Sequence, residues 1–298
     1  MVTAALIKEL REKSGAGMSD CKNALTEANG NLERASEILR EKGLSALAKK
    51  AGKSATEGLS YAVTEGGKAV ILEVNSQTDF VAKNELFTTF VSDVAKHILN
   101  SSVTTVEALL AEKWSVDNSL TVEEALSQKV AVIGEALSIR RFQKIESSYT
   151  VVNYIHAGGK VAVVVELIGA AGDSLVEAGK NVAMQIAAMN PQFVHRDQVD
   201  PDFIEKEKKI LTEQAIAEGT KPEIVEKKIE GRLSKNLKQI CLLDQDYVKD
   251  DKQTVASYLK SVGSDVTIKS FVRYETGEGM EKKEEDFAAE VQAAMQGQ

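Results

Sequence analysis

The chain has 298 residues, 43% of them apolar, and its 45 acidic and 37 basic side chains give a formal net charge of −8. This length is expected to divide into two or more domains, and the composition is that of a soluble globular protein with more helix than sheet. An acidic chain without a basic block argues against nucleic acid as the main partner.

Three short helices are expected near the N-terminus, within residues 3–42. The glycines at 15–17 end the first helix, Ser19 or Asp20 can cap the second, and Asn31 can cap the third. A unit this small is only marginally stable alone, so we expect it to dock on something else.

We expect the third of these helices to end before Gly43. The stretch that follows contains Lys49, Lys50 and Lys53 together with glycines and small residues, which is typical of a solvated linker.

The most informative stretch of the chain is residues 75–84, which follow an apolar run at 69–74 and lead into an amphipathic helix. The apolar face of that helix is formed at i, i+3, i+4, i+7 and i+11 by Phe87, Phe90, Val91, Val94 and Ile98. Thr78 or Asp79 can cap the helix start. Phe80 lies seven residues before Phe87 and so on roughly the same helical face, which favours a buried ring. The alternative is a ring displayed to a partner.

An internal repeat organises the middle of the chain. Tyr61 stands twelve residues before Glu73, and Tyr154 stands twelve before Glu166; a Gly-Gly-Lys turn lies between the members of each pair. Apolar runs on both sides of such a turn predict a β-hairpin. Each hairpin is followed by a loop with an Asp and an amphipathic helix, whose face in the second copy comprises Leu175, Val176, Val182, Ala183 and Ile186. We infer two related α+β subdomains, each a small antiparallel sheet covered by helices.

The two copies differ at the helix start. Where the first copy has Thr78, Asp79, Phe80 and Val81, the second has residues 169–174 and no aromatic side chain. Because the hairpin–helix pattern recurs without the Asp-Phe pair, the view that packing needs Phe80 is weakened.

A charged helical hairpin is predicted between residues 191 and 237. Its first helix starts at Asp202, a turn lies at 219–222, and the second helix has an apolar stripe formed by Val225, Ile229, Leu233 and Leu237. So narrow a seam with so much charge suggests a protrusion through which two copies could form a homodimer.

The last part of the chain predicts one strand and one helix. The strand, at 266–274, is expected to return to the second sheet, and the helix that follows Gly277–Gly279 carries Phe287, Val291 and Ala294 in register. We therefore predict an α+β fold with these parts: a three-helix (UBA-like) module and linker at 1–54, core subdomains at 55–146 and at 147–190 with 238–275, a helical hairpin at 191–237, and a C-terminal module at 276–298.

No enzyme constellation emerges from the residues. The Gly-Gly-Lys turns lack the remaining residues of a phosphate loop. His97, His156 and His195 are far apart and suggest no zinc site, and His97 is expected to be exposed or half-buried. Cys21 has no adjacent base and is expected to be a small buried thiol. We therefore expect a binding protein with no cofactor and no bound metal.

Two other classes of function stay open at this point. One is a scaffold or adaptor whose three-helix N-terminus binds peptides. The other is a metabolic enzyme of the α+β class, which the missing catalytic cluster disfavours.

Cysteine usage and the N-terminus bear on the compartment. Cys21 and Cys241 are widely separated, which suits a reducing compartment. The first residues lack the basic region and long apolar core of a signal peptide, and no apolar run suits a membrane span. We expect a cytoplasmic protein without a membrane partner.

Several segments together resemble the elongation factor Ts family. Residues 78–84 after an apolar strand are similar to the signature of that family, and further similar segments are 10–25, 154–160 and 277–291. The resemblance covers the whole chain in order.

The resemblance implies a guanine-nucleotide exchange factor that acts on the GTPase elongation factor Tu without a catalytic site of its own. Asp79 and Phe80, flanked by Thr78 and Val81, would enter the GTPase domain near its magnesium site and promote GDP release. Asp79 would act first as a cap and then as a contact. The remaining partner-binding residues implied are Met18, Ser19 and Lys22 toward the GTPase domain, His156 toward a distal domain of the partner, and Lys50. The C-terminal helix would add further contacts.

Overall fold

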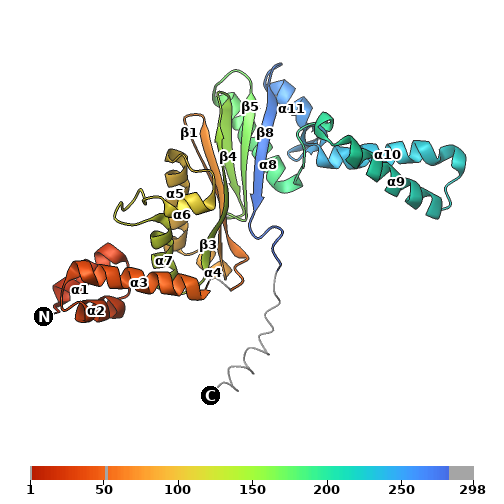
Figure 1. Ribbon diagram of the computed structural model, residues 1–298. Helices are drawn as coiled ribbons and strands as arrows, with labels where there is room; N and C mark the ends of the chain where they lie inside the picture. Colours follow the sequence, from red (N-terminus) through yellow and green to blue (C-terminus); the bar gives the residue numbers. More distant parts are fainter. Residues whose placement is uncertain (1, 51–52, 282–298) are drawn as a thin grey trace. The chain divides into compact units, whose positions relative to one another are not determined.

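The computed structural model describes residues 2–50 and 53–281 (Figure 1). It consists of helices and small antiparallel sheets, so the predicted α+β class is confirmed. The chain forms two compact units: unit 1 comprises Met1–Leu59, Leu72–Phe142 and Glu275–Gln298, and unit 2 comprises Ser60–Ile71 and Gln143–Tyr274. Among the described residues, no helix combines the length and apolarity needed to cross a membrane.

Unit 1 begins with the three predicted helices, α1 (Ala4–Ser14), α2 (Met18–Glu27) and α3 (Leu32–Lys50). They share a small core that includes Leu10, Cys21, Leu25 and Ile38. Gly15 ends α1 in the left-handed conformation, with φ 67°. The Asn31 side chain caps α3, since its Oδ1 accepts from Arg34 N at 3.0 Å. The predicted cap of α2 was wrong: α2 starts one residue before Ser19, and its N-cap is Gly17, without a side-chain hydrogen bond.

Helix α3 does not stop at Gly43 as expected. It continues to Lys50 and packs along α7 (Val122–Ile133). Gly43 is buried at this contact, where a Cβ atom would lie 3.1 Å from Ser127 Oγ. The glycine therefore permits a close approach of two helices, and the packing supplies stability that helix propensity alone would not. Lys49 and Lys50 are helical residues and not part of a linker.

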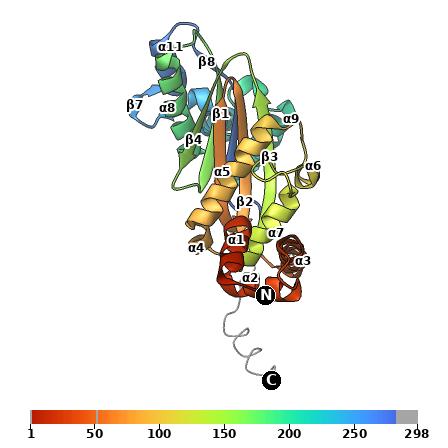
Figure 2. The same cartoon turned by 90° about the vertical axis from the view of Figure 1, so that its left-hand side faces the viewer.

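The first sheet has the order β1-β2-β3, with β1 (Glu57–Glu65), β2 (Lys68–Ser76) and β3 (Leu137–Glu146). Gly66 and Gly67 join β1 to β2 with φ of 57° and 80°, the positive values that a two-residue hairpin turn requires. Strand β3 was not predicted. Figures 1 and 2 show α5 (Glu85–Asn100) and α7 on one face of this sheet.

The five apolar residues predicted on the inner face of α5 are all buried. The expectation for His97 was wrong, because its ring is buried against Trp114 and lies 3.1 Å from Glu112 Oε2. The short helix α6 (Val106–Ala111) precedes this glutamate.

Unit 2 contains the second sheet, β4 (Thr150–His156), β5 (Val161–Ile168) and β8 (Thr267–Glu275), in the order β4-β5-β8. Strands β4 and β5 are antiparallel, from Thr150 opposite Leu167 to His156 opposite Val161. This confirms the second hairpin and the return of the late strand. Helix α8 (Asp173–Met189) packs on β4 and β5. Of its predicted inner face only Val176 is exposed, contrary to expectation.

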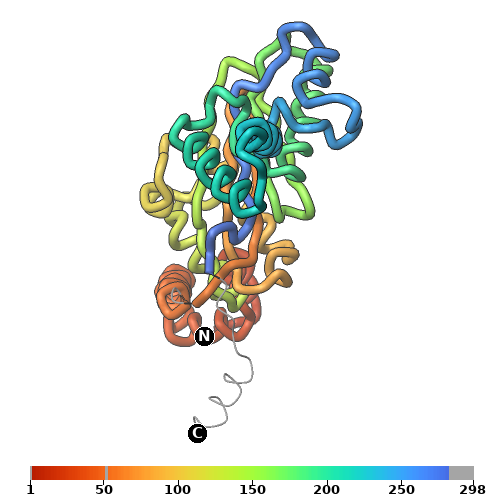
Figure 3. Tube along the Cα trace, turned by 90° about the vertical axis from the view of Figure 1, so that its right-hand side faces the viewer, coloured from red at the N-terminus to blue at the C-terminus, as the bar shows by residue number. Residues whose placement is uncertain are grey.

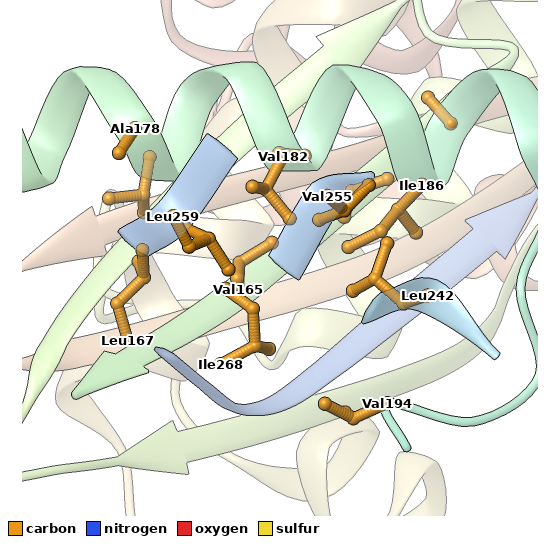
Figure 4. Close-up of a cluster of buried hydrophobic side chains, with 14 of the residues drawn as sticks. Val165, Leu167, Ala178, Val182, Ile186, Val194, Leu242, Val255, Leu259 and Ile268 are labelled. Atoms are coloured by element: carbon orange, nitrogen blue, oxygen red, sulfur yellow. The ribbon is translucent and has the colours of Figure 1, made fainter. Parts of the chain in front are cut away.

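Figure 4 shows the core beneath α8. Ala178, Val182 and Ile186 of α8 face Val165 and Leu167 of β5, and the remaining sides are closed by Leu242, Val255, Leu259 and Ile268. The 3-10 turn Leu242–Asp244, the short strand β6 (Asp246–Tyr247) and α11 (Val255–Val262) each contribute side chains to this core. A further 3-10 turn, Arg196–Gln198, and the strand β7 (Asp250–Thr254) complete the elements of this region.

The predicted helical hairpin is formed by α9 (Pro201–Ala217) and α10 (Pro222–Ile240), which lie side by side (Figures 1 and 3). Its seam buries Leu211, Ala215, Leu233 and Leu237. Association of two copies through it stays a prediction. The predicted helix with Phe287, Val291 and Ala294 lies outside the described residues.

Candidate functional site

The junction after β2 forms a one-turn helix, α4 (Asp79–Ala82). Thr78 is its N-cap, because the Thr78 side chain accepts a hydrogen bond from Val81 N at 3.4 Å. The role of cap expected for Asp79 was therefore wrong. Asp79 is the first helical residue, and its carboxylate accepts from Lys83 Nζ at 2.8 Å.

Phe80 is exposed, as the displayed alternative predicted, with 80% of its surface accessible. Val81, its neighbour, is only 8% exposed. Helix α4 ends at Ala82, and Asn84 caps a new helix, α5, by accepting from Leu86 N at 2.8 Å. Because the helix is interrupted, the seven-residue spacing to Phe87 does not place Phe80 on the buried face.

A glutamate that sequence reasoning missed holds this turn. Glu135 accepts from Thr78 N at 3.0 Å and from Thr78 Oγ1 at 2.8 Å. Next to it, Ala136 N donates to Gln77 Oε1 at 2.8 Å. The available signal was Gly134, a helix-ending glycine between α7 and an apolar run. Without β3 in the prediction, nothing indicated that this run lies beside β2.

Strand β2, which leads into the turn, carries the fully buried carboxylate of Glu73. It accepts from Arg140 Nη1 at 2.9 and 3.1 Å, Arg141 Nε at 2.6 Å and Gly277 N at 2.8 Å. Burial by itself raises the pKa of Glu73, but the hydrogen bonds from Gly277, Arg140, Asn75 and Arg141 outweigh it and hold the pKa below its ordinary value. The strand therefore carries a charged, fully bonded carboxylate at neutral pH.

The other predicted partner-binding residues are spread over both units. Met18, Ser19 and Lys22 lie at the start of α2 and are exposed, Met18 to 62%. Lys50, the last residue of α3, donates to the carbonyl of Gly134 and thus contacts the same loop as Thr78.

His156 belongs to unit 2, where it ends β4 and is half-buried. Its Nδ1 lies 3.1 Å from Tyr154 Oη. The structure thus groups eight of the nine predicted residues in unit 1 and places His156 in the other unit.

The polar groups next to the Phe80 ring are the Thr78 hydroxyl and the carboxylates of Asp79 and Glu135, all engaged in hydrogen bonds. Within the described part of the chain, no three His, Cys, Asp or Glu residues are arranged to hold a metal ion. Cys21 is buried, as expected. Cys241 is buried too, and burial raises the pKa of its thiol. The arrangement can present an apolar ring and an adjacent carboxylate to another molecule.

Comparison with known proteins gives a consistent family. The family model described as Elongation factor TS matches residues 77–278. The chain is similar to "Elongation factor Ts" of Clostridium novyi (strain NT), with 50% identity over 99% of both chains. Similar relatives of the same name occur in Clostridium perfringens (strain 13 / Type A), with 51% identity over 98% of both chains, and in Clostridioides difficile (strain 630), with 50% over 97%.

Proposed function

The chain belongs to the elongation factor Ts family, and from that premise we propose that it is the guanine-nucleotide exchange factor of elongation factor Tu. It binds the GDP form of this GTPase, inserts the Asp79–Phe80 turn, and leaves after GTP has replaced GDP during translation elongation. It has no catalytic site of its own.

The observation that carries the proposal is the exposed Phe80 ring on a bonded turn. Burying a phenylalanine stabilises a protein by about 1.5–3 kcal/mol, and this gain is forgone in the free chain. Insertion between helices of a partner would recover it. Asp79, beside the ring and 2.8 Å from the exposed Lys83 ammonium, would bring a carboxylate close to the magnesium site of the GTPase.

Disturbing the magnesium ion and the phosphate-binding loop of the partner would weaken its electrostatic hold on GDP. Thermodynamic reciprocity requires GDP and the exchange factor to weaken each other's binding by the same factor. A factor of about 10⁴ corresponds to roughly 5.5 kcal/mol of differential binding, more than one phenylalanine supplies. Phe80 therefore acts together with other contacts.

Those contacts are proposed for exposed residues of unit 1 and for the half-buried His156 of unit 2. Met18, Ser19 and Lys22 of α2 would grip the GTPase domain, and His156 would meet a distal domain. Three of the predicted residues make contacts within the chain: Thr78 and Lys50 form hydrogen bonds, and Val81 is buried. We assign these three residues to stabilising the conformation of the site.

Release of fluorescent GDP from elongation factor Tu, with and without this chain, tests the proposal. Phe80→Ala should lower the catalysed rate constant at least about tenfold, corresponding to the lower end of the burial energy of the ring. Phe203→Ala removes another exposed phenylalanine, on α9, and is the control. With this variant, elongation factor Tu should release GDP at the rate that the wild-type chain gives. Equal rates for Phe80→Ala and wild type would exclude the insertion, and binding without any acceleration would indicate an adaptor instead.

A further inference from the structure

Helix α4 is too short to set its own direction. It has four residues, and a single helical turn is not stable in isolation because nucleation fixes several residues for one hydrogen bond. The direction in which Phe80 points must therefore be imposed by contacts at the ends of the turn. At one end these are the buried side chains of Val81 and Ala82.

At the other end the contacts come from the 134–136 segment, the three residues that join α7 to β3. Glu135 accepts from both Thr78 N at 3.0 Å and Thr78 Oγ1 at 2.8 Å. The Thr78 hydroxyl donates its hydrogen bond to Glu135, and the lone pairs of the same oxygen face Val81 N, from which it accepts at 3.4 Å. A single carboxylate thus orients the cap that starts α4.

The neighbours of Glu135 strengthen this arrangement. Ala136 N donates to Gln77 Oε1 at 2.8 Å, and the Gly134 carbonyl accepts from Lys50 at the end of α3. All three residues of the 134–136 segment therefore bond to other parts of unit 1. The N-terminal helices, through Lys50, and the Phe80 turn, through Thr78, therefore both bind the 134–136 segment.

We propose that Glu135 is a positioning residue for Phe80: through Thr78 it holds the turn in the direction that the partner requires. The inference rests on the proposed exchange function and adds to it a residue that does not itself touch the partner. Charge-assisted hydrogen bonds are the strong ones, and a carboxylate is suited to accept the two from Thr78 at once.

Two variants of the full-length protein separate positioning from a general loss of stability. Glu135→Ala removes both acceptors, while Glu135→Gln keeps the shape and one acceptor oxygen. Glu123→Ala, which changes an exposed glutamate on α7, is the matched control. The hydrogen-exchange rate of the Thr78 amide in the free protein directly reports the hydrogen bond from Thr78 N to Glu135. It should become about tenfold faster in Glu135→Ala, less so in Glu135→Gln, and be unchanged in the control.

GDP release from elongation factor Tu then reports the consequence. Glu135→Ala should slow the catalysed release about tenfold, and Glu135→Gln less. In a Phe80→Ala background Glu135→Ala should have no further effect, because a residue that acts through Phe80 has nothing left to position. A thermal melt shows which variants are folded. If Glu135→Ala does not fold, the GDP-release rate of Glu135→Gln tests the positioning role instead.

Three results would overturn the positioning role. The first is wild-type GDP release by a variant whose Thr78 amide has lost its protection. The second is an equal slowing by Glu135→Ala with and without Phe80, since Glu135 would then act by another route. The third is an unprotected Thr78 amide in the wild type. Failure of the exchange function itself is recognised separately, by a wild-type chain that binds elongation factor Tu without accelerating GDP release.

Discussion

Two neighbouring side chains at the junction have opposite surroundings. Phe80 is 80% exposed and Val81 8% exposed. In a helix, consecutive residues point about 100° apart, so a single turn can display one and bury the next. The local backbone thereby separates a residue that serves binding from one that serves stability.

This separation predicts different costs of truncation. Phe80→Ala should change the free energy of unfolding by less than about 0.5 kcal/mol, because the ring makes little buried contact. Val81→Ala should lower it by about 1–2 kcal/mol, from two buried methyl groups and the space they leave. Urea unfolding followed by circular dichroism measures both. A large loss in Phe80→Ala would mean that the ring packs within the chain, contrary to the proposal.

At the scale of elements, the helical hairpin divides its apolar residues between a seam and an outer surface. Leu211 is buried against α10, whereas Ile210 is about half exposed. Charged hydrogen bonds join the two helices near the turn: Glu218 accepts from Arg232 and Lys228 at 2.7–3.1 Å, and these hydrogen bonds lower the pKa of Glu218 to about 2. The narrow seam makes the hairpin sensitive to single truncations.

Adjacent residues of α9 allow a matched test of the seam. Leu211→Ala should destabilise the hairpin by about 2–5 kcal/mol, since it removes a buried leucine and leaves a cavity. Ile210→Ala should cost less than about 0.5 kcal/mol. Hydrogen exchange of α9 and α10 amides would show the difference locally. Similar protection in both variants would mean that the seam is not what holds the two helices together.

For the molecule as a whole, each copy of the internal repeat buries a carboxylate at the corresponding strand position. Glu73 on β2 is bonded to Arg140 and Arg141. Glu166 on β5 is bonded to Lys269 and Ser270, each at 2.9 Å, and to Ser147. Burial raises the pKa of Glu166 as well, but the hydrogen bonds from Ser147, Lys269 and Ser270 outweigh it, so its pKa also lies below the ordinary 4.5.

Both carboxylates therefore link stability to pH. A group whose pKa is lower in the folded chain stabilises it above the unfolded pKa, and this contribution is lost as pH falls through the folded pKa. Stability should be nearly constant near neutral pH and decline from roughly pH 5 downward. Urea unfolding across this range is the measurement.

Replacing one carboxylate identifies its share of the effect. Glu73→Gln should lower the free energy of unfolding by about 3 kcal/mol at pH 7, because two arginines remain without their buried partner. The fall of this free energy as the pH is lowered should be shallower than in the wild type. Glu123→Gln, on the exposed face of α7, should behave as the wild type. An unchanged acid slope in Glu73→Gln would assign the acid sensitivity to other groups.

The sequence alone determined the features that depend on local periodicity and turn chemistry. These include the three N-terminal helices, the two hairpins with their Gly-Gly turns, the apolar face of α5 and the helical hairpin, as well as the resemblance to a family that the relatives confirm. Such signals extend over a few neighbouring residues and do not require knowledge of distant contacts.

Only the tertiary structure decided what depends on residues far apart in the chain. Helix α3 passes Gly43 because α7 packs against it, and β3 is recognised by its place beside β2. Phe80 is outside because Asn84 starts a new helix, and the turn that carries it is held by Glu135, 57 positions away from Thr78. Contacts over such separations leave no period in the sequence, so the direction of the ring is a property of the folded chain.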